Sequence, residues 1–155
     1  MKTRLLAFVC LVTVAAFAAK HPDFAGSWEF NAGKSKNIGM MTQAKMTRTI
    51  QQTDAALDET THTTFQDNNQ DMKTHYDLTG KPANNDFPMT GPSETVSKWD
   101  GDKLVTAWTS ESAVAGGSKV VRIETLSLSP DGNIMTVESV RGSNPPVIIV
   151  FDKKR

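Results

Sequence analysis

The chain has 155 residues and 17 basic against 17 acidic side chains, so its formal net charge is zero. It contains no basic run and no interleaving of arginine with aromatic residues, which excludes nucleic acid as an expected partner. Beyond the N-terminus no apolar stretch is long enough to span a bilayer, so we expect no membrane span. These properties favour a soluble globular protein.

The N-terminus has the three parts of a secretory signal peptide. Lys2 and Arg4 form a short positive region, residues 5–17 form an apolar run, and Ala-Phe-Ala at 16–18 matches a small-x-small cleavage site. The run is too short for a transmembrane helix. We therefore predict cleavage before Ala19 and a secreted or periplasmic location.

Removing residues 1–18 leaves residues 19–155, which is enough for one domain with a real core. The single cysteine, Cys10, is lost with the leader, so no disulfide supports the mature domain. Losing Lys2 and Arg4 leaves an excess of two acidic groups.

Short alternating runs rich in Thr, Val and Ile, separated by turn residues, predict an all-β protein with little or no helix. Residues 32–43 and 79–93 are the expected irregular segments; the first, with two glycines and no amphipathic period, predicts a short loop. The consecutive hairpins indicate an antiparallel meander, which removes its exposed edges by closing into an up-and-down β-barrel of about eight to ten strands. The expected strands cover residues 24–31, 44–53, 56–66, 71–78, 94–99, 103–110, 119–128, 133–141 and 147–152.

The first hairpin is predicted to turn at Asn68-Asn69, because asparagine tolerates the left-handed conformation that tight turns need. This register places His62 opposite His75 on a polar, solvent-facing side of the strand pair. Two imidazoles with Asp77 nearby are weak candidates for a divalent metal site. Two exposed histidines with no ligand are the favoured interpretation, because Lys73 lies on the same face.

The second hairpin is predicted to turn at the sequence WDGDK, where Asp100-Gly101 is a strong hairpin signal. Alternation puts Lys98 and Lys103 on one face, which prefers water, and so turns the other face inward. A solid core and an apolar pocket both remain open for that interior. The candidate pocket residues on the inward face are Trp99, Leu104, Thr106 and Trp108.

The third hairpin is predicted to turn at SPDGN, with Glu124 opposite Glu138 and Arg122 on the same face. If this face points inward, the three charges could orient the polar head of a ligand. If it points outward, they form a solvated cluster of little energetic consequence. We favour the outward orientation, because charged groups are rarely buried without a partner.

The stretch Phe24-Ala25-Gly26-Ser27-Trp28 resembles the first strand of the calycin superfamily, the lipocalins and fatty-acid-binding proteins, in which a G-x-W motif opens the barrel. Lys98-Trp99-Asp100-Gly101 is similar to a hairpin motif of intracellular fatty-acid-binding proteins. The stretches GSWEFNAGKSK, LSLSPDGNIMTV and VIIVFDKK resemble small secreted bacterial lipocalin-like proteins of uncharacterised function.

The resemblance implies that Trp28 closes one end of the barrel and that a later arginine packs on it, with Arg141 the candidate and Arg122 second. We expect Gly26 where another group approaches the backbone closely. Two family features are missing. Residues 32–43 do not predict a two-helix lid, and the last strand has Val-Phe-Asp at 150–152 instead of an Arg-x-Tyr pair that grips a carboxylate.

The sequence therefore predicts a small β-barrel that binds a small hydrophobic or amphipathic ligand, such as a lipid, in its interior. The alternative is a ligand-free module of the cell envelope with a packed core and an unknown protein partner. No catalytic motif and no cofactor motif is present, so we expect neither enzymatic activity nor a cofactor.

Overall fold

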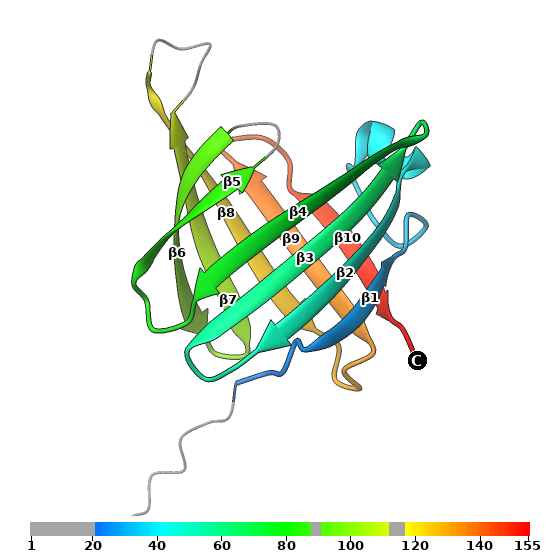
Figure 1. The fold of residues 1–155 in the computed structure, drawn as a ribbon, viewed down its shortest axis with the longest axis horizontal. Helices are drawn as coiled ribbons and strands as arrows, with labels where there is room; N and C mark the ends of the chain where they lie inside the picture. Colours follow the sequence, from blue (N-terminus) through cyan, green and yellow to red (C-terminus); the bar gives the residue numbers. More distant parts are fainter. Residues whose placement is uncertain (1–20, 88–90, 112–116) are drawn as a thin grey trace, which may run out of the picture.

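The computed structural model describes residues 21–87, 91–111 and 117–155. The predicted signal peptide lies outside these residues. Ten antiparallel strands follow one another around a nearly closed barrel, as Figure 1 shows. The strands are β1 (Gly26–Phe30), β2 (Lys45–Gln52), β3 (Ala56–Phe65), β4 (Asn68–Asp77), β5 (Pro82–Phe87), β6 (Gly91–Asp100), β7 (Lys103–Glu111), β8 (Lys119–Leu128), β9 (Ile134–Arg141) and β10 (Val147–Lys153).

The order of the strands in the sheet is that of a meander with one closure. β1 pairs with both β2 and β10, so the sheet runs from β4 through β1 and β10 to β5. The prediction of an all-β, up-and-down barrel is confirmed. The irregular segment after β1 contains only one short helical element, the 3₁₀ helix η1 (Gly39–Gln43).

One strand, β5, was not predicted. Its sequence Pro-Ala-Asn-Asn-Asp-Phe has little β propensity, and we expected residues 79–93 to be irregular. It forms because it pairs along its whole length with β6, from Pro82 opposite Val96 to Phe87 opposite Gly91. Pro82 is tolerated because it is the first residue of the strand.

The edges of the sheet, β4 and β5, meet through a side chain. The amide of Asn85 accepts a hydrogen bond from the His75 backbone N–H (2.8 Å) and donates one to the His75 carbonyl (2.8 Å). It also donates to the Thr95 hydroxyl at 2.8 Å. Asn85 therefore takes the place of a ladder hydrogen-bond pair between the two edges.

The core consists of the inward-facing residues of the strands. Trp28, Leu57, Leu104, Leu126 and Phe151 are each fully buried. They come from β1, β3, β7, β8 and β10, so strands from both halves of the sheet contribute to one core.

Candidate functional site

A cavity of about 370 Å³ lies inside the barrel, between η1 and the inner faces of β2, β3, β4 and β10. Seven of its eleven lining side chains are apolar, and four of these seven are methionines. The strand residues among them alternate along β2 and β3, as one face of a strand must. The lining residues are Met40, Met41, Ala44, Met46, Arg48, Thr61, Thr63, Phe65, Gln70, Met72 and Ile149.

The cavity has an outer and an inner end. Phe65 ends β3 next to the β3–β4 turn, and Met40 in η1 is 77% exposed, so the cavity reaches the surface between these two elements. In Figure 1, η1 (the cyan coil) lies beside the tip of the β3–β4 hairpin. Arg48 and Thr61 are directly paired across β2 and β3, further from the tip, and form the inner end.

The opposite end of the barrel is closed by the segment before β1. The Gln52 side chain accepts a hydrogen bond from Phe24 N–H (2.9 Å) and donates one to the Pro22 carbonyl (2.9 Å). Phe24 is fully buried, and its carbonyl accepts a hydrogen bond from the indole N–H of Trp28 at 2.9 Å. Access to the interior is therefore by the end that η1 borders.

A buried ion pair stands at the inner end of the cavity. Nη1 of Arg48 donates to Oε2 of Glu59 at 3.1 Å, and the two side chains are 8% and 1% exposed. The other carboxylate oxygen of Glu59 accepts a hydrogen bond from the Thr61 hydroxyl at 2.7 Å. The Arg48 guanidinium also stacks on Phe151, 4.5 Å from the ring centre. Burial lowers the pKa of Arg48, but the charge of Glu59, followed by Tyr76 and Glu124, outweighs this effect and raises that pKa overall.

A second polar group lies deeper in the barrel. The Tyr76 hydroxyl donates to Oε1 of Glu124 at 3.2 Å, and Nη2 of Arg122 lies 3.9 Å from the other carboxylate oxygen. The Arg122 guanidinium also stacks on Trp108. Burial raises the pKa of Glu124, and the charges of Arg122 and Arg48 act in the opposite direction. Burial, followed by the charge of Glu124, raises the pKa of Tyr76 well above its ordinary value.

The inward face of the second hairpin is as predicted. Leu104 and Thr106 are fully buried, Trp108 is 4% exposed, and Lys98 and Lys103 are exposed. These residues do not line the large cavity. Trp108 borders a separate space of only about 30 Å³ with Arg122 and Arg141. Their role in ligand binding stays a prediction.

Trp99, the fourth candidate of this hairpin, lies at the closed end of the barrel. Its ring stacks on His21, with the ring centres 4.2 Å apart and nearly parallel, and also lies against Phe24. It belongs to the closure formed by the segment before β1.

The predicted register of the third hairpin is wrong. Glu124 is opposite Ser139, and Glu138 is opposite Thr125. The Ser129 N–H donates to the Ile134 carbonyl (2.9 Å), so the turn contains four residues, one more than predicted. Because side chains alternate along a strand, one extra turn residue exchanges the inward and outward faces of β9 relative to β8. Glu138 is therefore exposed, while Glu124 is buried and Arg122 half-buried, against our favoured outward orientation.

The predicted register of the first hairpin is also wrong. The turn is at Gln66-Asp67, both with positive φ (47° and 63°). His62 is opposite Asp71, and His75 is opposite Asp58. Nδ1 of each histidine lies within hydrogen-bonding distance of the carboxylate of the aspartate across from it.

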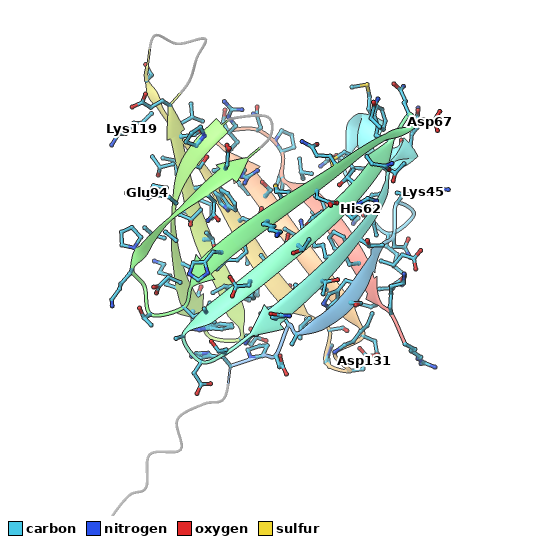
Figure 2. All side chains as sticks on the ribbon, in the orientation of Figure 1. Lys45, His62, Asp67, Glu94, Lys119 and Asp131 are labelled. Atoms are coloured by element: carbon cyan, nitrogen blue, oxygen red, sulfur yellow. The ribbon has the colours of Figure 1, made fainter. Side chains whose placement is uncertain are left out.

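The two histidines lie on the outer face, as predicted, but they do not meet. Figure 2 shows His62 on the outside of β3 and Asp67 at the hairpin tip. Within the described ranges, no group of three or more His, Cys, Asp or Glu side chains is arranged to hold a metal ion.

Trp28 is fully buried at the closed end. The cation that packs on it is Lys153, whose Nζ lies 5.2 Å from the ring centre; the assignment to Arg141 is wrong. Arg141 is paired with Arg122 at the other end of β9. Gly26 has a φ of +133°, and a Cβ there would lie 3.2 Å from Cε of Lys153. The predicted close approach to Gly26 is thus made by the same lysine.

None of the residues that line the cavity was among the predicted site residues. Met40 and Met41 lie in a segment without periodicity, and only the dense run of methionines between residues 40 and 46 distinguishes it. Arg48 and Glu59 stand at alternating inward positions of β2 and β3, where a charged residue contradicts the expected apolar pattern. Charged residues at these inward positions were a second sequence signal for the site, besides the methionines.

Several solved structures with a similar fold are named as fatty-acid or lipid-binding proteins. The REP1-NXSQ fatty acid transporter is 16% identical, with a TM-score of 0.64 over 84% of this chain and 96% of that chain. Apo lipid binding protein 8 of Caenorhabditis elegans is 13% identical, with a TM-score of 0.66 over 84% and 95%. Fatty-acid-binding protein 1 of Echinococcus granulosus is 11% identical, with a TM-score of 0.66 over 85% and 98%.

No protein-family model and no curated protein sequence matches the chain. Across the part of the chain that the structure describes, no helix is long and apolar enough to cross a membrane. The ten-stranded meander and these structural likenesses show that the chain has the fold of the calycin superfamily.

Proposed function

We propose that this protein binds one small, elongated apolar or amphipathic molecule in the cavity between η1 and β2–β4. The observation that carries this proposal is the cavity itself. Its volume of about 370 Å³ is within the usual range for ligand pockets. Its methionines are flexible and polarisable, so they can adapt to ligands of different shape.

The architecture supports the same function. One end of the barrel is closed by Phe24 and Trp28. The cavity opens at the other end, where η1 forms part of its wall. Three of the similar solved structures are named for fatty acid transport, lipid binding and fatty acid binding. We propose no enzymatic activity for the chain.

We also propose that the protein acts outside the cytoplasm, as a secreted or periplasmic carrier. Support comes from the charged, apolar and small-residue regions of residues 1–18. N-terminal sequencing of the protein from its own cell should give Ala19 as the first residue. An intact Met1 on the exported fraction would contradict the proposal.

Binding is tested by titration with Nile red, an uncharged dye whose emission responds to an apolar environment. We expect saturation with one dye per chain and displacement by long-chain lipids. Thr63→Phe fills part of the cavity from β3 and should weaken dye binding about tenfold or more. Thr60→Phe, on the exposed outer face of the same strand, is the matched control and should bind like wild type.

The absence of saturable dye binding by the folded wild type would contradict the proposed function. The alternative of a ligand-free envelope module would then take its place. Equal weakening by Thr63→Phe and Thr60→Phe would show that the dye binds elsewhere.

A further inference from the structure

We propose that Glu59 determines which head group the cavity accepts: a long apolar molecule with a neutral, hydrogen-bond-accepting end, such as an ester or an alcohol, in preference to a carboxylate. This inference rests on the proposed function and concerns the inner end of the same cavity.

The inner end offers a buried donor without a partner. Arg48 lines the cavity, and its side chain is more than nine-tenths buried. Its Nη1 is used by Glu59, but its Nε has no hydrogen-bond partner among the described residues. A buried N–H without a partner is costly. This Nε has almost no accessible surface, so an acceptor on the ligand can satisfy it only after a local adjustment of the groups that cover it.

The position of the guanidinium is fixed. Glu59 holds one side of it, and the ring of Phe151 supports its flat face at 4.5 Å. Glu59 itself is held by the Thr61 hydroxyl at 2.7 Å. Protein groups therefore already hold the Arg48 guanidinium in place before a ligand enters.

The charge of Arg48 is already neutralised. A carboxylate that entered the cavity would lose its hydration and meet a guanidinium that is paired with Glu59, with the Glu124 carboxyl group near enough to influence Arg48 as well. Burying a charge without a free counter-ion is unfavourable, whereas a neutral acceptor loses far less on burial. The other polar lining groups, Thr61, Thr63 and Gln70, carry no charge that could compensate.

Contacts from two other strands agree with this arrangement. In the last strand, the ring of Phe151 lies against the Arg48 guanidinium. The second buried carboxyl group, that of Glu124, is engaged by Tyr76 and Arg122.

The test is a ranking of three ligands with the same chain length, myristic acid, methyl myristate and tetradecan-1-ol, by displacement of Nile red at neutral pH. For wild type we expect the ester and the alcohol to bind about tenfold or more tightly than the acid. Glu59→Gln retains acceptor and shape but frees the charge of Arg48, so it should reverse the ranking in favour of the acid. Asp58→Asn removes a carboxylate from the outer face of the same strand and should leave the ranking unchanged.

The outcomes separate the two proposals. If wild type binds Nile red but prefers the acid, or ranks all three ligands equally, the role of Glu59 is refuted and the cavity proposal stands. If it binds neither the dye nor any ligand, both proposals fail. The wild-type ranking needs no variant, so it can refute the proposal even if the loss of the buried pair leaves Glu59→Gln unfolded, whereas the reversal in Glu59→Gln is what supports the role of Glu59.

Discussion

Single side chains hold the closed end of the barrel together. Gln52 and Trp28 hold the segment before β1 across the closed end through hydrogen bonds to its backbone. Lys153 covers Trp28 and passes close to Gly26. At the turn between β8 and β9, Asp131 accepts hydrogen bonds from Ser129 and Asn133, and Figure 2 shows it at the rim of the barrel.

Asp131 should make the stability of the protein depend on pH. Its hydrogen bonds, first that from Ser129, lower its pKa from 3.8 to about 2. A carboxylate with a lowered pKa in the folded state stabilises the fold above its unfolded pKa, and this contribution is lost as pH falls through the folded pKa. Asp131→Asn should therefore reduce stability at pH 7, with a difference from wild type that shrinks between pH 4 and about 2.

Urea midpoints measured across this pH range check the prediction. Asp102→Asn in the β6–β7 turn is the matched control, since no hydrogen bond to its side chain is found among the described residues. A deficit of Asp131→Asn that stays constant down to pH 2 would contradict the assignment.

At the scale of elements, the closure of the sheet depends on a strand with poor β propensity. β5 pairs with β6 on one side, and on the other it reaches β4 through the side chain of Asn85. The junction between β4 and β5 therefore depends on one side chain, whereas all other neighbouring strands are joined by backbone hydrogen bonds.

Asn85→Ala should open this junction. The loss of the hydrogen bonds to His75 should cost about 1–3 kcal/mol, because the backbone groups left behind are partly buried. Hydrogen exchange of the His75 amide should accelerate, while amides of the β2–β3 ladder stay protected. Asn84→Ala, at the exposed neighbouring position, serves as control. Unchanged protection of the His75 amide in Asn85→Ala would show that Asn85 does not close the sheet.

For the molecule as a whole, the structure separates stability from binding. The closed end and the axis hold the fully buried aromatic residues, whereas the end near η1 holds the cavity and its methionines. An interior that is solid at one end and hollow at the other should respond differently to the same kind of truncation.

Trp28→Ala should reduce the free energy of unfolding by about 3–5 kcal/mol, the usual cost of truncating a buried aromatic residue. Met72→Ala should cost less than about 2 kcal/mol, because this half-buried side chain already borders empty space. Denaturant titrations of both variants give the comparison. Equal costs would show that the two ends are packed alike.

Much of the fold follows from local pattern. Alternation along a strand fixes which side chains share a face, so Leu104, Thr106 and Trp108 could be placed inside and Lys98 and Lys103 outside. The tight turns and the G-x-W stretch then identify a meander barrel with Trp28 in its core. These conclusions need only neighbours in sequence, because period and turn chemistry are local properties.

The candidate site depended on the tertiary structure. One additional turn residue between β8 and β9 placed Glu138 outside and Glu124 inside, and a turn at Gln66-Asp67 separated the two histidines. β5 exists because β6 offers it a partner, not because its sequence favours a strand. The cavity arises because η1 packs over the ends of β2 and β3 without filling the space beneath it. Empty space is a property of all the surrounding elements together, so no single stretch of sequence specifies it.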